Sequence, residues 1–354
     1  MKKNKLLLTA LAWVPVFCGL ANAAPVAGEV APNSLTGQTI VFASSGGILQ
    51  DGQKQAIWDP FQKESGATVL QDSGVFSKLK AMIDSKNVSW DMYIGDRYLS
   101  YQYCGDFFEK IDKTVVDLTN IPEGLVSDDC MVPAIIYADI MVYDADKYST
   151  PPKNWQDFFD VEKFPGKRGV NMSSNPMTGL IVGALLADGV APDKLYPIDF
   201  DRAFKKLRSI EDHLVGWTTG AQAQQQLESG EVSMAQVWNG RGFGAAQAGH
   251  NIKPIWNDWM VAVDSVSIPK GSKNVAAAQA GLNYYLGAKQ TERLAELTSY
   301  APVNVNAKPQ LSDLAIQWMP NKERFKTSHN PDVKWWSEHW SEFSDRWSAW
   351  ISGY

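Results

Sequence analysis

Short apolar runs alternate with segments of helical period along the first third of the chain. A clear helical segment precedes Gly66, where Ile57 and Phe61 fall on one face. Strands that alternate with helices form parallel sheets covered by helices, so this pattern predicts an α/β fold. The expected strands are 38–43, 67–70 and 90–94, and the expected helices are 51–64 and 76–85.

A second alternation begins after Pro151 and Pro152 and predicts another α/β unit. Between the two units, the apolar stretch 133–144 is expected to continue the sheet or to cross to a second lobe. The strands expected in the second unit are 169–172, 232–238, 252–255 and 260–268, and the helices are 155–159, 178–186, 200–209, 222–229, 276–286 and 292–298.

The end of the chain carries an aromatic stripe. Residues 332–350 are expected to form one helix, because Trp336, Trp340, Phe343 and Trp347 are spaced by three and four. Fourteen tryptophans are many for 354 residues, and such a surplus can provide flat walls for a ligand. At helical spacing, however, we expect the rings of the tail to form core.

The N-terminus has the pattern of a secretory signal peptide, covering residues 1–23. Three lysines precede an apolar run at 6–20, and Ala21-Asn22-Ala23 is a small-residue cleavage site. Export leaves Cys104 and Cys130 in an oxidising compartment, where we expect them to form a disulfide.

Composition and missing motifs narrow the function classes. The length of 354 residues predicts about two domains, and 45 % hydrophobic with 20 % charged residues allows a core in each. The formal net charge is −6 and there is no basic block, which argues against nucleic acid as a partner. The sequence has no hydrolase elbow, zinc motif or nucleotide-binding loop, so no residue is nominated as catalytic and no cofactor or metal is expected.

Several short segments carry a family resemblance. They are 46–47, 60–66, 90–93, 154–158, 164–167, 228–232, 237–240 and 264–269. In this order they resemble the periplasmic solute-binding proteins of ABC importers, and within these the spermidine/putrescine-binding branch. The resemblance runs from about residue 38 to the tryptophan-rich tail.

The resemblance implies a type II periplasmic-binding-protein fold of class α/β. Two lobes, each a parallel-type sheet flanked by helices, are joined by hinge strands and close around one ligand. Lobe 1 is expected to comprise 24–135 and 262–310, and lobe 2 to comprise 136–261 and 311–354. The chain would be a monomeric periplasmic protein, not an enzyme, that delivers a small molecule to an inner-membrane ABC permease.

Three residues define the expected ligand. By resemblance, Asp264 matches the aspartate that takes an ammonium in this branch, and Trp238 matches an aromatic wall. Arg241 stands where the polyamine branch has a small residue, and a guanidinium pairs with a carboxylate through a planar fork. A zwitterion with one ammonium and one carboxylate satisfies both charges, and the ω-amino acid GABA is the best single candidate. The alternative for Arg241 is a position in solvent or a pair with an acid of the opposite lobe.

Further cleft residues are expected in the loops that follow strands. They are Ser45, Gly46, Asp96, Arg97, Tyr98 and Ser173. Arg97 would add a second cation, although a surface position is equally open.

Three other functions stay open at this point. The first is a polyamine receptor, and the second is a ferric-ion receptor that uses Tyr284 and Tyr285, whose apolar helix favours core packing instead. The third is a secreted hydrolase, which would need a second acid facing Asp264 across the cleft.

Overall fold

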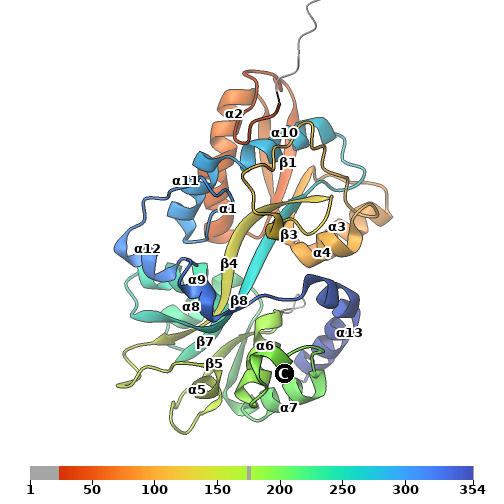
Figure 1. The fold of residues 1–354 in the computed structure, drawn as a ribbon. Coiled ribbons are helices and arrows are strands. Elements are labelled where there is room, and N and C mark those ends of the chain that lie inside the picture. The colour runs from red at the N-terminus through yellow and green to blue at the C-terminus, as the bar shows by residue number, and fades with distance from the viewer. Residues whose placement is uncertain (1–23, 174–176, 354) are drawn as a thin grey trace, which may run out of the picture.

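The computed structural model describes residues 24–173 and 177–353. The expected signal peptide, residues 1–23, lies outside the described residues. Figure 1 shows two α/β bodies, one above and one below the point where two long strands, β4 and β8, run side by side. These strands carry the chain between the bodies and position the site described below.

One mixed sheet of nine strands runs through both bodies, in the order β2-β1-β3-β8-β4-β7-β5-β6, and β9 pairs with β8. The strands are β1 Thr39–Ser44, β2 Thr68–Ser73, β3 Met92–Asp96, β4 Met131–Asp144, β5 Arg168–Asn171, β6 Leu214–Trp217, β7 Met234–Trp238, β8 Ile252–Ser267 and β9 Ser328–His329. Pairs at both ends are parallel, as the alternation predicts. The middle pairs, β3–β8, β8–β4 and β4–β7, are antiparallel and join the expected two sheets into one.

Helices cover both faces of this sheet (Figure 1). The α-helices are α1 Gly47–Gln53, α2 Asp59–Ser65, α3 Phe76–Asp84, α4 Arg97–Tyr103, α5 Trp155–Phe159, α6 Thr178–Ala187, α7 Phe200–Arg208, α8 Gly220–Glu228, α9 Asn239–Gln247, α10 Val275–Tyr285, α11 Ala288–Thr298, α12 Asp313–Trp318 and α13 Val333–Ile351. A π-helical segment, Lys54–Trp58, joins α1 to α2, so the helix expected at 51–64 forms one continuous rod that begins four residues earlier.

The strands expected at 252–255 and 260–268 form a single strand, β8. The polar residues that suggested a break are part of the strand, and Asp258 adopts a left-handed backbone conformation with φ 56°. Its partner β4 has register shifts between Pro133 and Ile135 and between Asp139 and Met141. Such irregularities bend a strand.

Separate hydrophobic cores lie in the two bodies. One cluster contains Ile40, Trp58 and Leu282 and draws on residues of 24–135 and 266–303. Two others contain Leu180, Trp217 and residues of the C-terminal helix. We therefore retain as a proposal the boundaries stated above, with lobe 1 at 24–135 and 262–310 and lobe 2 at 136–261 and 311–354.

Helix α9 contains three glycines that lower helix propensity, and the sequence pattern does not predict it. A Cβ atom at Gly240 would lie 2.5 Å from the Tyr300 hydroxyl, and one at Gly242 would lie 2.2 Å from the Trp318 ring. Close packing thus excludes a side chain at both positions. The same helix carries Arg241 in its first turn.

Helix α4 replaces the loop expected after β3. Asp96 is its N-cap, and the Asp96 carboxylate accepts a hydrogen bond from the backbone N–H of Tyr98 at 2.9 Å. Carboxylates favour this position because they satisfy N–H groups at the start of a helix.

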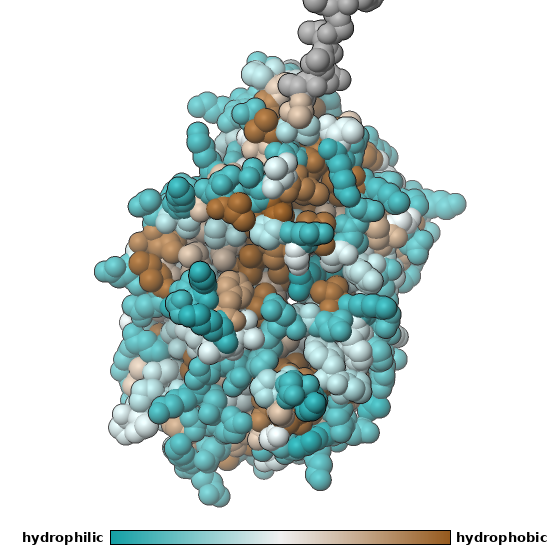
Figure 2. Space-filling view, in the orientation of Figure 1, coloured by the Kyte–Doolittle hydropathy of each residue, from teal (hydrophilic) through white to brown (hydrophobic). Residues whose placement is uncertain are grey.

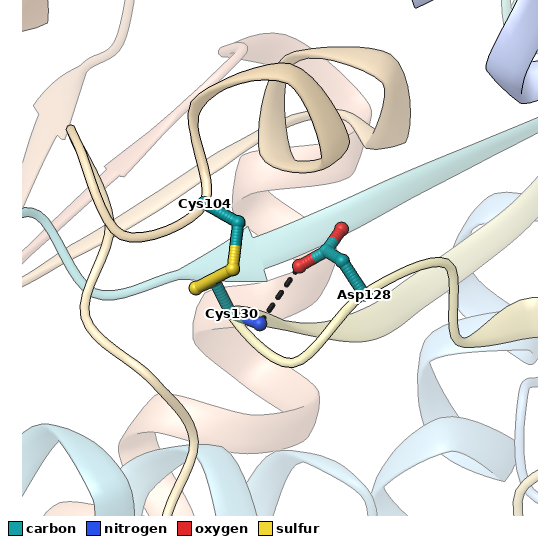
Figure 3. Close-up of side chains that lie close together, drawn as sticks. All are labelled: Cys104, Asp128 and Cys130. Atoms are coloured by element: carbon teal, nitrogen blue, oxygen red, sulfur yellow. Dashed lines mark hydrogen bonds between the residues drawn. A yellow bond between two sulfur atoms is a disulfide. The ribbon is translucent and has the colours of Figure 1, made fainter.

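The expected disulfide is present between Cys104, which ends α4, and Cys130, which precedes β4. Figure 3 shows the nearby carboxylate of Asp128, which accepts a hydrogen bond from the Cys130 backbone N–H at 2.7 Å. Because both sulfur atoms are bonded to each other, this cluster is a structural link between α4 and the start of β4.

Hydrophilic residues dominate the face of the molecule shown in Figure 2, and hydrophobic ones are seen mainly in its upper and middle parts. Within 24–173 and 177–353, no helix has the length and apolar character that a membrane crossing requires.

Candidate functional site

A cavity of about 500 Å³ lies between the lobes, within the range typical of small-molecule sites. Its floor is one face of the central sheet, where alternate residues of a strand point the same way. Strand β4 contributes Ile135, Tyr137 and Asp139, and β8 contributes Met260, Ala262 and Asp264. Trp238 at the end of β7 and Asp96 at the end of β3 extend the floor on either side.

Arg241 reaches this cavity from α9. It is only 4 % exposed, its Nε–H has no hydrogen-bond partner, and no carboxylate of the described residues lies within ion-pair distance. The guanidinium lies 5.9 Å from the centre of the Trp238 ring. It also packs on Gly47 of lobe 1, where a Cβ atom would lie 2.6 Å from Nη1. A buried cation without a counter-ion is costly, so the position favours an anionic group in the cavity.

The opposite charge is supplied by Asp264 and Asp96. Asp264 accepts a hydrogen bond from the Tyr137 hydroxyl at 3.1 Å. Burial raises the pKa of Asp264 to about 6, and burial together with the nearby Asp264 charge raises the pKa of Asp96 to about 7. A cation bound in the cavity would therefore stabilise the ionised form of both carboxylates.

A third acid, Asp139, lies on the same sheet face, four residues along β4 from the Ile135 that pairs with Asp264. It is 4 % exposed and accepts hydrogen bonds from the Gly179 backbone N–H at 3.1 Å and from the Gln236 side chain. Burial raises its pKa to about 7. Since Gly179 is in the first turn of α6, Asp139 stabilises that helix start while it lines the cavity.

Six of the nine expected ligand residues line the cavity. They are Ser45, Asp96, Tyr98, Trp238, Arg241 and Asp264.

The other three do not line it. Arg97 is buried and directs Nη1 toward the Gly124 carbonyl at 3.5 Å, so the second cation expected in the cleft is absent there. Gly46 precedes α1 with φ 74° and serves the turn rather than the cavity wall. Ser173 donates from its hydroxyl to the Asn171 side chain at 3.0 Å and accepts from the Trp347 indole through its carbonyl, which directs it into lobe 2.

Several residues of the cleft were not predicted from the sequence as site residues. Tyr98 of lobe 1 and Thr178 of lobe 2 both line the cavity, and the Tyr98 ring lies 5.7 Å from that of Trp340. Trp340 lines the cavity, so one ring of the tail stripe is a wall residue while its neighbours form core. Tyr137 and Asp139 lie within the apolar stretch 133–144, and the charge of Asp139 in the middle of that stretch is the feature that could have indicated a site residue.

Tyr284 and Tyr285 belong to the core of lobe 1. The hydroxyl of Tyr285 accepts from the Gln53 amide at 3.0 Å, and that of Tyr284 donates to Glu64 at 2.8 Å. Neither lines the cavity, so these two tyrosines do not provide the ferric-ion site that the hypothesis requires.

Residues 56–323 match the family described as bacterial extracellular solute-binding protein. The chain belongs to this family. Its members bind solutes and are not enzymes, and such proteins deliver small molecules to ABC permeases. The hydrolase hypothesis is therefore wrong.

Relatives within this family differ in the ligand that their names state. The gamma-aminobutyric acid-binding protein of Pseudomonas aeruginosa is 29 % identical over 325 residues, covering 89 % of this chain and 91 % of its own. The spermidine/putrescine-binding periplasmic protein of Escherichia coli K12 is 24 % identical over 272 residues, covering 72 % and 75 %. The solved Atu4243-GABA receptor has a TM-score of 0.81 and 37 % identity, covering 89 % of this chain and 98 % of that one.

Replacing Asp264 with asparagine is expected to stabilise the unliganded protein at pH 8. The ordinary pKa of 3.8 is raised to about 6 in the fold, so the folded state loses stability as the pH rises through this window. At pH 8 the full penalty is present, and its removal should add on the order of 1–3 kcal/mol to the free energy of unfolding. Urea denaturation at pH 8 and pH 4 measures this, and the gain should nearly vanish at pH 4. An equal gain in the free energy of unfolding at both pH values, or a loss at both, would show that burial does not destabilise the ionised Asp264 carboxylate.

Proposed function

We propose that this protein binds an ω-amino acid, with GABA as the best candidate, in the cavity between its lobes. It does so in the periplasm and delivers the ligand to an inner-membrane ABC permease. The observation that carries this proposal is Arg241, a buried guanidinium without a carboxylate partner among the described residues, in the same cavity as Asp264. A ligand carboxylate would neutralise Arg241, and a ligand ammonium would neutralise Asp264.

Arg241 and Asp264 lie on different elements of the fold, an arrangement that favours an ω-amino acid over an α-amino acid. Arg241 projects from α9 of lobe 2, whereas Asp264 lies on the sheet floor opposite Asp96 of lobe 1. An α-amino acid holds both charges on neighbouring atoms, whereas an ω-amino acid spreads them along an aliphatic spacer. The spacer would lie against Trp238, whose ring is only partly exposed. The names of two relatives, which state GABA, support the same choice.

A polyamine is the second candidate. Three acids, Asp96, Asp139 and Asp264, line the cavity. Two basic residues, Arg241 and Lys80, also line the cavity. Lys80 is exposed at the rim and forms an ion pair with Asp84. The excess of carboxylates favours a cation, and the relative named for spermidine and putrescine points the same way.

Three ligands with the same four-carbon chain separate these candidates. GABA has an ammonium and a carboxylate, putrescine has two ammonium groups, and butyrate has a carboxylate only. A ligand that binds only the folded state stabilises it by about 2.7 kcal/mol at a hundredfold excess over Kd. We expect GABA to raise the Tm by several degrees and the other two to raise it much less. A putrescine shift equal to or larger than the GABA shift would overturn the proposal in favour of a polyamine receptor.

Replacing Trp238 with alanine is expected to weaken GABA binding by roughly 1–2 kcal/mol, through lost contact area and lost attraction for the cation. Titration calorimetry measures the change, which corresponds to about tenfold in Kd. Trp238→Phe retains a ring and serves as the matched control, with an expected Kd close to that of the unmodified protein. An unchanged Kd for Trp238→Ala would show that this ring does not touch the ligand.

A further inference from the structure

Asp96 and Asp264 are direct cross-strand partners in the antiparallel pair β3–β8. Residues opposite each other in such a pair have Cβ atoms about 4.5–5.5 Å apart on the same face of the sheet. Both side chains line the cavity. Two carboxylates in this position repel each other when both are ionised, and one proton between them relieves the repulsion.

No described residue forms an ion pair with either carboxylate, although the Arg97 charge lies near enough to lower the pKa of Asp96. Asp96 accepts from the Tyr98 N–H, Asp264 accepts from the Tyr137 hydroxyl, and the cavity face adds the neutral Tyr93 and Tyr300. The other charged or titratable residues near the pair or in the same cavity are Arg97, Arg241, Lys80, Tyr285 and Asp139.

Each of the three basic residues is directed elsewhere. Arg97 turns to the Gly124 carbonyl, Lys80 pairs with Asp84, and Arg241 reaches the cavity from α9 without coming within ion-pair distance of a described carboxylate. Asp139 lies four residues along β4 from Ile135, the residue that pairs with Asp264, and it accepts a hydrogen bond from the Gly179 backbone N–H.

We infer that Asp96 and Asp264 form a single ammonium-binding pole that shares one proton when the cavity is empty and releases it when a primary ammonium binds. The ligand ammonium keeps its three N–H bonds and donates them to acceptors of the pole, while the shared proton leaves a carboxyl oxygen for solvent. The raised pKa values of both acids agree with this assignment. The inference deepens the proposed function and rests on it for the ligand.

Two consequences follow for specificity and pH. A quaternary ammonium has no N–H to donate, so the N-trimethyl analogue of GABA should bind at least tenfold more weakly than GABA. Affinity for GABA should rise as the pH increases through 6 to 7. Above this range both carboxylates are ionised, so a proton no longer competes with the ligand ammonium for them.

The test is calorimetry with GABA at pH 6.5 in two buffers of different ionisation enthalpy, which counts the protons released per ligand. The unmodified protein should release a substantial fraction of one proton. Asp96→Asn should bind GABA more weakly and release less than half as many protons, while the amide oxygen still accepts from Tyr98 as a helix cap. The matched control is Asp199→Asn, the exposed cap of α7, which accepts from the Arg202 N–H at 3.0 Å and should leave both quantities unchanged.

GABA binding without proton release, or equal release by Asp96→Asn and the unmodified protein, would overturn this inference and leave the proposed function intact. Equal affinity for GABA and its N-trimethyl analogue would also overturn it. If only putrescine binds, and does so with proton release that Asp96→Asn reduces, the pole is retained and the proposed function fails. If neither GABA nor putrescine binds, both fail.

Discussion

Replacing Arg241 with alanine is expected to weaken GABA binding by a factor of about thirty or more. The guanidinium is 4 % exposed and has no carboxylate partner in the described chain, so a ligand carboxylate would be its counter-ion. Truncating one member of a buried charge pair costs roughly 2–5 kcal/mol, and every 1.4 kcal/mol is about tenfold in Kd. Titration calorimetry with GABA measures the loss.

Putrescine provides the contrast for this variant. A second ammonium is repelled by Arg241, so Arg241→Ala should bind putrescine as well as the unmodified protein does, or better. Arg202→Ala removes an exposed arginine that pairs with Asp188, and it controls for a general loss of positive charge. An equal loss of affinity for GABA and putrescine would mean that Arg241 acts on the fold of the site and not on a carboxylate.

Replacing Asp264 with asparagine is expected to abolish most of the affinity for both ligands, with a loss of at least thirtyfold for each. Both ligands carry an ammonium, and the neutral amide supplies one acceptor but no charge. The amide oxygen still accepts from the Tyr137 hydroxyl, so the cavity keeps its shape. Calorimetry at pH 8 compares this variant with the unmodified protein, under conditions where the native carboxylate is ionised.

The same variant should be more stable than the unmodified protein when unliganded, as argued above, which separates lost function from misfolding. Asp199→Asn again provides the control, because it changes an aspartate to asparagine on an exposed helix cap. Retained affinity in Asp264→Asn would assign the ammonium to one of the other two acids that line the cavity, Asp96 or Asp139.

The outer strands and most helices could be predicted because their signals are local. Apolar runs such as 38–43 and helical periods such as 200–209 correspond to β1 and α7 with small shifts in their ends. Helix α9 could not be predicted, because glycines disfavour a helix. The reason for Gly240 and Gly242 lies in tertiary packing, since a side chain at these positions would collide with Tyr300 and Trp318. The continuity of β8 through Asp258 likewise depends on pairing with β4, which is distant in sequence.

The candidate site was predicted where charge chemistry sufficed and missed where geometry decides. Arg241 and Asp264 stand out by residue type at positions that match the family pattern, and both line the cavity. Arg97 has the right charge, but the first turn of α4 directs it to Gly124. Trp340 has a spacing identical to that of its core neighbours, and only the packing of α13 against α4 brings it to the cavity.

The arrangement also explains why a ligand would hold the lobes together. Arg241 of lobe 2 packs on Gly47 of lobe 1, and Tyr98 of lobe 1 meets Thr178 and Trp340 of lobe 2. Bringing these surfaces together removes water from Arg241 and from Asp96. A zwitterion in the cavity would offset both desolvation penalties, and a neutral molecule of the same size would offset neither.

A crystal structure of the protein with GABA tests this account most directly. We predict that the GABA carboxylate lies within hydrogen-bond distance of the Arg241 guanidinium and that the ammonium lies within hydrogen-bond distance of Asp264 and Asp96. Trp238 should cover the carbon chain between them. A ligand bound in the reverse orientation, or outside the cavity that these residues line, would contradict it.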